Sequence, residues 1–324
     1  MTYSLAPSSN PPRLRFTDDG RSIELHPIWV RERTNEEGTR DPLSKQRLYD
    51  PAEIDPALTA LHIESNGTST TITWSDEHVQ RVDHEALAAE LGWAPRPEAL
   101  PAAVSWASEP VPFPRFDWPA EGDDVSLHAA LDAFWTHGFV VFSKASTEIG
   151  SLEQIAGRFG PVRETNFGLL FDVFSKPNPV DLAYTPLELK AHTDNPYRRP
   201  VPSIQFLHCL VNDATGGEST LVDGKAAAED YAALDPEGYE VLTSTMVSYW
   251  YQYENELLST RAPILETEQD GSFFGIRNSD RVDFVDAVDP DTLDVFYRAR
   301  AGLRKLLNDP ARRATFLLLS LIHI

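Results

Sequence analysis

The chain has 324 residues, of which 41% are apolar and 24% are charged, so it is long enough for about two folded domains. It carries 50 Asp and Glu against 28 Lys and Arg, and this formal charge of −22 disfavours nucleic-acid or anionic-membrane partners but suits a cationic small molecule. Its single cysteine, Cys209, excludes a disulfide framework and a Cys-rich zinc cluster, and it fits a cytoplasmic setting.

The N-terminal third predicts a small β-rich domain. Residues 1–12 are polar and Pro-rich, so we expect a disordered leader there and no signal peptide. Apolar and polar residues then alternate, which predicts short strands at 21–26, 28–30, 60–64 and 70–74. Asn66-Gly67 is a strong turn signal and predicts a hairpin between the last two. We therefore expect a β-rich domain over 13–95, followed by a Pro-rich linker at 96–120.

Helix signals mark the second domain, which we expect over 121–324. Leu127, Leu131 and Phe134 have helical spacing in the segment 126–137, and Gly138 ends it. A buried strand follows at 139–142. Ser151 and Gln154 form a capping box, which predicts a helix ending at Gly160.

Two Asp-Pro pairs predict further helix starts, because an N-cap precedes a proline at the first helical position. Asp235-Pro236 opens one helix, and Asp289-Pro290 opens a longer one that ends near Asn308. Short strands elsewhere, with helices outside them, predict a mainly β fold: a double-stranded β-helix, or jelly roll, with flanking helices.

The pair His192-x-Asp194 is the main candidate for chemistry. On a strand, residues two apart point to the same side, so an imidazole and a carboxylate would meet at one point. They are two of the three ligands of a 2-His-1-carboxylate triad, which leaves open positions on Fe(II). Alone the motif is weak, and a hydrogen-bonded surface pair is the alternative. Strands at 202–211 and 218–224 would form a buried hairpin directly after it.

Four sequence blocks carry a family resemblance. They are His192-Thr-Asp-Asn-Pro-Tyr-Arg, Gln205-Phe-Leu-His-Cys-Leu, Thr215-Gly-Gly-Glu-Ser and Val222-Asp-Gly. Block by block they resemble the γ-butyrobetaine dioxygenase and trimethyllysine dioxygenase family, within the taurine-dioxygenase-like Fe(II)/2-oxoglutarate oxygenases. The resemblance runs from about residue 14 to residue 316.

The resemblance implies a catalytic jelly roll behind a small N-terminal β domain. It implies Fe(II) as cofactor, with 2-oxoglutarate and O2 as co-substrates and ascorbate as a possible reductant. The expected reaction is hydroxylation of a small trimethylammonium compound, first of all γ-butyrobetaine to carnitine. Trimethyllysine, a trimethylamino-phosphonate or another small molecule are the alternatives, and a homodimer is a possible assembly. From another class, a non-catalytic jelly-roll binding protein without a complete iron site also remains open.

Site residues follow from the resemblance position by position. His192 and Asp194 match iron ligands, and Leu207 matches a position in the 2-oxoglutarate pocket. A quaternary ammonium cannot donate N–H hydrogen bonds, so the family surrounds it with aromatic faces. The expected substrate contacts are Phe167, Phe171, Asp181, Tyr184 and Asn278.

Two departures from the family pattern carry expectations of their own. The cysteines of the family's N-terminal zinc site are absent and only His78 is kept, so we expect no structural zinc and a leftover or hydrogen-bonded His78. The match fades after Phe316, before the family's distal iron histidine and its 2-oxoglutarate arginine. We do not expect His323 to replace that histidine. We therefore expect the 324-residue chain to be truncated and inactive, and a longer version to turn over.

Overall fold

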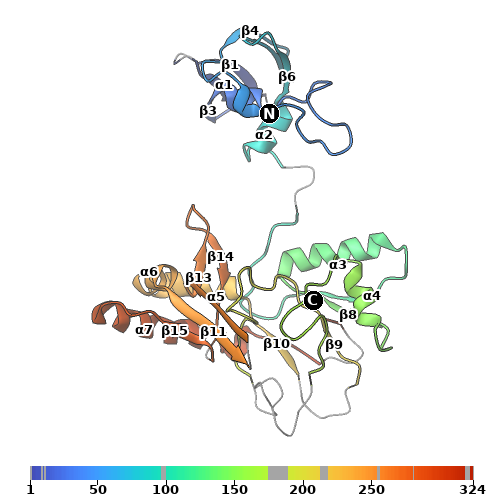
Figure 1. The fold of residues 1–324 in the computed structure, drawn as a ribbon, viewed down its shortest axis with the longest axis vertical. Coiled ribbons are helices and arrows are strands. Elements are labelled where there is room, and N and C mark those ends of the chain that lie inside the picture. Colours follow the sequence, from blue (N-terminus) through green and yellow to red (C-terminus); the bar gives the residue numbers. More distant parts are fainter. Residues whose placement is uncertain are drawn as a thin grey trace. The chain divides into compact units, whose positions relative to one another are not determined.

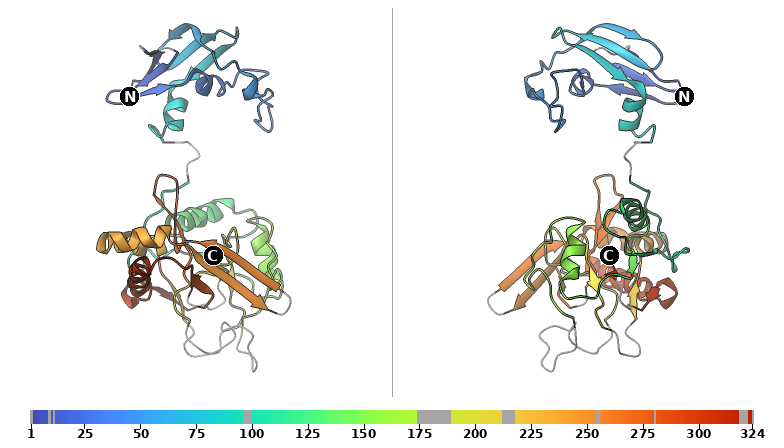
Figure 2. Two further views of the ribbon diagram at one scale, coloured as in Figure 1. Left: turned by 60° about the vertical axis from the view of Figure 1, so that its left-hand side comes forward. Right: turned by 90° about the vertical axis from the view of Figure 1, so that its right-hand side faces the viewer.

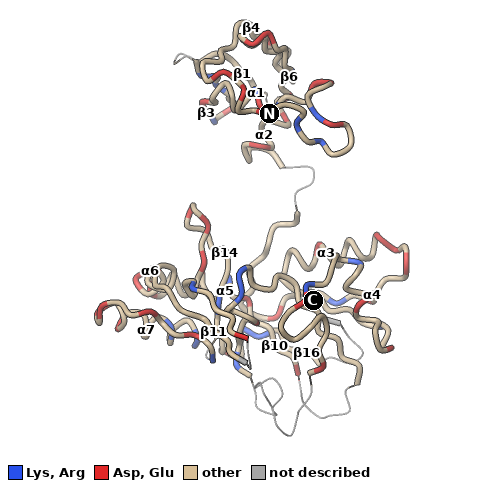
Figure 3. Tube along the Cα trace, viewed as in Figure 1, with Lys and Arg blue, Asp and Glu red and all other residues tan. Residues whose placement is uncertain are grey.

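A computed structural model describes residues 2–8, 10, 12–95, 100–173, 189–211, 218–253, 256–279, 281–317 and 322–323. The chain divides into two compact units, Met1–Ala99 and Leu100–Ile324 (Figure 1). Acidic residues are spread over both units and do not gather in one segment (Figure 3). Among the described residues, no helix is both long enough and apolar enough to cross a membrane.

The first unit contains two antiparallel three-stranded sheets. One consists of β1 (Ser4–Pro7), β2 (Leu14–Thr17) and β3 (Ser22–Leu25), and the other of β4 (Ala60–Ser65), β5 (Ser69–Trp74) and β6 (Val79–Asp83). The helices are α1 (Pro27–Arg31), η1 (Pro51–Glu53) and α2 (His84–Glu90). Leu5, Phe16, Ile72 and Trp74 fill the core. The predicted hairpin is confirmed, since β4 and β5 pair across a turn in which the Asn66 side chain accepts from the Ser69 amide.

Two predictions for this unit are wrong. Residues 28–30 lie in α1, because Pro27 occupies its first turn and the His26 ring accepts from the Ile28 amide. A run of three apolar residues is too short to show whether the apolar positions repeat as in a strand or as in a helix. The helix-capping residues therefore decide the structure of this segment. Part of the expected disordered leader forms β1, since Leu5 is buried while its strand neighbours are exposed.

The second unit mixes helices with short strands. Its helices are α3 (Asp124–His137), α4 (Ser151–Gly157), α5 (Gly224–Leu234), α6 (Pro236–Ser244), α7 (Pro290–Leu307) and η3 (Pro310–Arg312). Its strands are β7 (Arg115–Asp117), β8 (Val141–Ser143), β9 (Leu207–His208), β10 (Ser219–Leu221), β11 (Val247–Tyr253), β12 (Glu256–Ala262), β13 (Leu265–Thr267), β14 (Phe273–Ile276), β15 (Asp283–Val285), β16 (Ala314–Phe316) and β17 (Ile322–His323).

These strands form separate small sheets. The orders are β7-β8-β17-β9, β12-β11-β15, β13-β14 and β10-β16. Within the described ranges no sheet closes into a barrel, so the architecture is a mixed helix and strand fold, more helical than the mainly β jelly roll expected from the sequence.

The predicted hairpin between 202–211 and 218–224 is wrong. β9 pairs with β17, and β10 pairs with β16, so each strand takes a partner from the far end of the chain. Phe206 packs in the cluster that contains Phe142 and Ile155, whereas Leu207 packs beside Val141 and Phe316. Phe206 and Leu207 are therefore half-buried against two different clusters, and their packing does not arise from a local hairpin.

The predicted helix starts and stops have mixed outcomes. Asp235 and Asp289 cap α6 and α7 as expected, and Gly138 ends α3 in the left-handed conformation with φ 79°. The capping box at Ser151 is wrong. Gly150 precedes α4, and the Ser151 hydroxyl donates to the carbonyls of Ser146 and Glu148.

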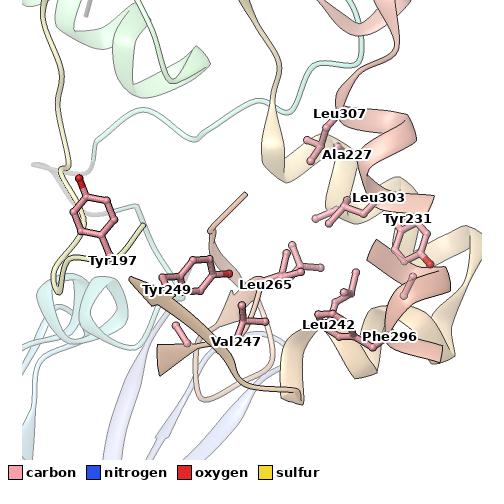
Figure 4. Packing of buried hydrophobic residues seen from close by; sticks show 14 residues of the cluster. Tyr197, Ala227, Tyr231, Leu242, Val247, Tyr249, Leu265, Phe296, Leu303 and Leu307 are labelled. Atoms are coloured by element: carbon pink, nitrogen blue, oxygen red, sulfur yellow. The ribbon is translucent and has the colours of Figure 1, made fainter. Parts of the chain in front are cut away.

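The largest core of this unit lies between helices and the β11 and β13 strands (Figure 4). Leu242 of α6 and Phe296 and Leu303 of α7 are almost fully buried there, with Val247 and Tyr249 of β11. α6 and α7 lie side by side (Figure 2). This core supports the residues after β14, which contact the candidate site.

Candidate metal centre

His192 and Asp194 lie in a loop, so their predicted strand is wrong. Their side chains nevertheless converge, with His192 Nε2 3.3 Å from Asp194 Oδ1. The two side chains are 27% and 44% exposed, so an ion could reach both. The predicted meeting of an imidazole and a carboxylate is therefore present, although a turn and not strand alternation produces it.

Hydrogen bonds orient both donors. His192 Nδ1 lies 2.8 Å from the carbonyl oxygen of Lys190. A carbonyl can only accept, so Nδ1 carries the hydrogen and Nε2 is directed toward Asp194. A second hydrogen bond joins Asp194 to the side chain of Gln205, just before β9. Metal-binding histidines usually donate a hydrogen bond from the ring nitrogen that does not bind the metal, as His192 does from Nδ1 to the Lys190 carbonyl.

Each group of the pair favours the charged form of the other. The hydrogen bond that His192 donates to Asp194 raises the pKa of His192, although burial acts in the opposite direction. The same hydrogen bond lowers the pKa of Asp194, against the effect of burial. The positive charge of Arg281 opposes the rise in the pKa of His192 and adds to the fall in the pKa of Asp194.

The donor set fits an Fe(II) ion. Two ligand atoms about 2.1 Å from one octahedral ion, at right angles to each other, are about 3 Å apart. The observed 3.3 Å between His192 Nε2 and Asp194 Oδ1 is close to this separation. In the part of the chain that the structure describes, no third His, Cys, Asp or Glu joins them as a cluster. β17, which contains His323, pairs with β8 and β9.

A second pair with the same spacing shows what distinguishes this one. In β4, His62 Nε2 lies 2.8 Å from Glu64 Oε1, but these side chains are 66% and 73% exposed. Among the described residues, no third group forms a hydrogen bond with the side chain of His62 or Glu64. His192 and Asp194 are each held by a third group, so they match a built site, whereas His62 and Glu64 match a surface ion pair.

Four aromatic rings form a chain in the same unit as the donors. Phe167 lies 5.5 Å from Phe171 and 5.9 Å from Tyr251 of β11, between ring centroids. Tyr251 stacks on Tyr197 at 5.1 Å, and Tyr197 is only three residues from Asp194. Phe171 is half exposed, which leaves an aromatic face open to solvent. We call Phe167, Phe171, Tyr197 and Tyr251 the aromatic chain.

The remaining predicted site residues are placed as follows. Leu207 of β9 packs against the cluster that contains Val141 and Phe316. Asn278 is only 8% exposed, and its amide nitrogen donates to the carbonyl of Ala191 at 2.6 Å. Asp181 and Tyr184 lie outside the described residues.

Sequence reasoning missed Tyr197, Gln205, Tyr251 and Arg281. Tyr197 and Gln205 stand inside the quoted family blocks, so their proximity to the ligands was a usable signal. Tyr251 gave no such signal, because it reaches the aromatic chain only through the placement of β11.

The position of the family's zinc site holds a hydrogen-bond network. His78 Nε2 lies 2.9 Å from the hydroxyl of the buried Thr34, which also bonds Glu36. Glu36 Oε1 in turn accepts from the Arg81 amide at 2.6 Å. His78 is thus hydrogen-bonded, one of the two states expected for it, and the network links the 34–36 turn to β6.

Comparison with known proteins relates the second unit to one family. Residues 98–318 match the family model described as "Taurine catabolism dioxygenase TauD, TfdA family". The γ-butyrobetaine dioxygenase of Pseudomonas sp. (strain AK-1) is 31% identical over 299 residues, covering 90% of this chain and 78% of the relative. The trimethyllysine dioxygenase of Meyerozyma guilliermondii is 25% identical over 316 residues, covering 91% and 79%. The mitochondrial trimethyllysine dioxygenase of Bos taurus is 26% identical over 296 residues, covering 87% and 70%.

Proposed function

Because the chain belongs to the TauD/TfdA dioxygenase family, and is therefore a 2-oxoglutarate-dependent dioxygenase, we propose that it hydroxylates a small trimethylammonium compound, γ-butyrobetaine first. The product would be carnitine. The observation that carries this proposal is the convergence of His192 and Asp194 at 3.3 Å in the unit that also contains the aromatic chain.

His192 and Asp194 would hold the iron through Nε2 and a carboxylate oxygen. Bound Fe(II) would supply oxygen activation coupled to the decarboxylation of 2-oxoglutarate to succinate, and the protein supplies ligation, orientation and exclusion of water. Lys190 and Gln205 orient the two donors through their bonds to His192 and Asp194. Leu207 remains our proposal for the wall of the 2-oxoglutarate pocket, within a jelly-roll catalytic domain.

The aromatic chain supports a quaternary ammonium as the substrate's cationic group. Phe167 and Phe171 are two of the expected cage residues, and Tyr251 adds a ring from β11. Aromatic faces attract such a cation with about 0.5–2 kcal/mol. Phe is a weaker wall than Trp, and Asp181 would repel a substrate carboxylate. Trimethyllysine and a trimethylamino-phosphonate, which also carry anionic groups, remain the alternative substrates.

Succinate release tests the function directly. We would assay the 324-residue chain, and a chimera continued past Phe316 with the matching residues of the Pseudomonas relative. Each receives Fe(II), 2-oxoglutarate, ascorbate and one substrate at a time: γ-butyrobetaine, trimethyllysine, a trimethylamino-phosphonate, or 5,5-dimethylhexanoate. In 5,5-dimethylhexanoate, a neutral carbon atom replaces the positively charged nitrogen of γ-butyrobetaine, and the rest of the molecule is the same.

We expect substrate-dependent succinate in at least the chimera, larger with γ-butyrobetaine than with its carbon isostere. The difference isolates the charge that the aromatic rings would recognise, because the shape is the same. Succinate release that is equal with both compounds would reject the trimethylammonium substrate. No substrate-dependent succinate from either protein would reject the hydroxylase proposal itself.

A further inference from the structure

Two consecutive residues after β14 contact both ends of the segment that bears His192 and Asp194. The first, Arg277, is only 4% exposed. Its Nη1 donates to the carbonyls of Pro196 at 2.6 Å and Arg198 at 2.9 Å. Its Nε donates to Glu266 Oε1 at 2.7 Å, so its charge is compensated on the side away from the segment. Arg277 therefore fixes the backbone that follows Asp194.

The second residue, Asn278, fixes the backbone on both sides of His192. Its side-chain nitrogen donates to the Ala191 carbonyl at 2.6 Å. Its carbonyl accepts from the Thr193 amide at 2.9 Å, and its own amide donates to the Thr193 hydroxyl at 3.0 Å. From α7, Asn308 Oδ1 accepts from the Ala191 amide at 3.2 Å. The peptide groups before and after His192 are thus both held.

The residues that provide these bonds are themselves fixed. The Arg277 amide donates to the Ile264 carbonyl at 2.8 Å, and its carbonyl accepts from the hydroxyl of Tyr249 at 3.1 Å. Tyr249 is fully buried in the main core, on β11. The bonds therefore connect a loop, which has no strand partner of its own, to the rigid core of the unit.

We propose that Arg277 and Asn278 are positioning residues that fix the backbone of residues 191–198, and with it the directions of His192 and Asp194. A metal site requires its donors within about 0.5 Å of the productive geometry. Because His192 and Asp194 lie in a turn, strand pairing cannot provide this precision, and the hydrogen bonds of Arg277 and Asn278 do. The inference rests on the proposed function for the identity of what the segment binds.

The two asparagines allow a matched test, because they use opposite ends of their amides. Asn278 donates to Ala191, whereas Asn308 accepts from Ala191. Asn278→Asp replaces the donor by an oxygen and breaks the bond. Asn308→Asp keeps the accepting oxygen and its bond to Ala191, and it loses only the bond that Asn308 Nδ2 donates to the Arg304 carbonyl at 2.8 Å. Both variants lose one amide donor and add the same negative charge, so the difference between them reports the bond to the Ala191 carbonyl.

Hydrogen–deuterium exchange gives the first readout, and it needs no metal. We expect the amides of residues 191–193 to exchange at least about 10-fold faster in Asn278→Asp than in Asn308→Asp, while amides of α7 before its last turn stay protected in both. Co(II) titration gives the second readout. Partners of ligand residues typically contribute about 10- to 100-fold to metal affinity, so we expect a loss of that size in Asn278→Asp only.

Equal exchange of residues 191–193 in the two variants would overturn the inference. So would wild-type Co(II) affinity in Asn278→Asp when His192→Ala abolishes binding. If Asn278→Asp does not fold, Asn278→Ala removes the same donor without adding charge, and the same exchange criterion decides. If the exchange difference is present but neither the 324-residue chain nor the chimera binds Co(II), the proposed function is rejected and the role of Asn278 stays in place.

Discussion

At the scale of single residues, the candidate site depends on what holds each side chain from behind. His192 Nδ1 is bonded to a backbone carbonyl and Asp194 to Gln205. The exposed pair His62 and Glu64 has the same spacing in the sequence. The motif alone therefore does not distinguish a metal site from a surface ion pair, and the supporting hydrogen bonds are the feature that a metal site would require.

Phe167 offers a test of the cation site at this scale. It contacts both Phe171 and Tyr251, so Phe167→Leu removes the central ring and keeps an apolar side chain. In the chimera, we expect the KM for the trimethylammonium substrate to rise about 10-fold with little change in kcat, because a cation–π contact contributes about 0.5–2 kcal/mol. Phe284→Leu is the control, since its ring stacks on Trp250 outside the aromatic chain. An unchanged KM in Phe167→Leu would remove this ring from the site.

His84 makes the stability of the N-terminal unit depend on pH. The side chain is 1% exposed, and burial lowers its pKa below the ordinary 6.5. Above pH 6.5 neither the folded nor the unfolded state is protonated, so His84 contributes no pH dependence. As pH falls below 6.5 the unfolded state gains the proton first, and the free energy of unfolding decreases until the folded pKa is reached.

We expect His84→Gln to reduce this acid loss of stability, measured by hydrogen exchange of β5 between pH 8 and pH 5. His62→Gln should keep the wild-type pH dependence, because His62 is exposed. If the stability of β5 falls with pH as steeply in His84→Gln as in the wild type, His84 does not cause the acid loss of stability.

At the scale of elements, α7 packs against α5 through one glycine. A Cβ built at Gly302 would lie 2.6 Å from Cε2 of Tyr231, whose ring is 4% exposed. The Tyr231 hydroxyl donates to Asp235 at 2.9 Å, and burial first, then this bond, raises the Tyr231 pKa to about 12. The ring has little freedom to move, so close packing of the helices requires glycine.

Gly302→Ala should therefore destabilise the protein by about 1–3 kcal/mol, the usual cost of overpacking. An exposed helical Gly→Ala change has the opposite sign, about 0.5–1 kcal/mol stabilising. Gly157→Ala in α4 is the matched control, since nothing lies within 4 Å of its built Cβ. Chemical denaturation of the wild type, Gly302→Ala and Gly157→Ala measures whether each substitution raises or lowers the free energy of unfolding. Stabilisation by Gly302→Ala would contradict the described packing of α7.

Elements with a local signal were predictable from the sequence. Asp289-Pro290 begins α7, Gly138 ends α3 and Asn66-Gly67 turns the β4–β5 hairpin, because each residue acts on its own backbone. Elements with distant partners were not. β9 pairs with β17, and no pattern in residues 202–211 specifies that partner.

In the candidate site too, features with a local signal were predictable and features that depend on distant residues were not. The pairing of His192 with Asp194 followed from their spacing, although they lie in a loop and not on a strand. The contribution of Tyr251 to the aromatic chain could not be predicted, because β11 is positioned by the core of α6 and α7. The role of Asn278 was also hidden, since its partners Ala191 and Thr193 are more than eighty residues away.

At the scale of the whole molecule, the net charge of −22 acts on both units. Like charges repel in the compact state, and salt screens them over about 10 Å at 0.1 M. We expect the melting temperature to rise when NaCl increases from about 10 to 200 mM. A melting temperature that falls over this range would show that attractive ion pairs, such as Arg298 with Glu237, dominate over the repulsion.

The most direct test of the central claim is an anaerobic Fe(II) titration of the 324-residue chain, of His192→Ala and of His62→Ala. His192 and His62 each contact a carboxylate two residues away, so the two variants remove the same kind of pair. We predict that His192→Ala weakens Fe(II) binding at least about 100-fold, whereas His62→Ala binds as the wild type does. Wild-type affinity in His192→Ala would contradict the assignment of His192 and Asp194 as iron ligands.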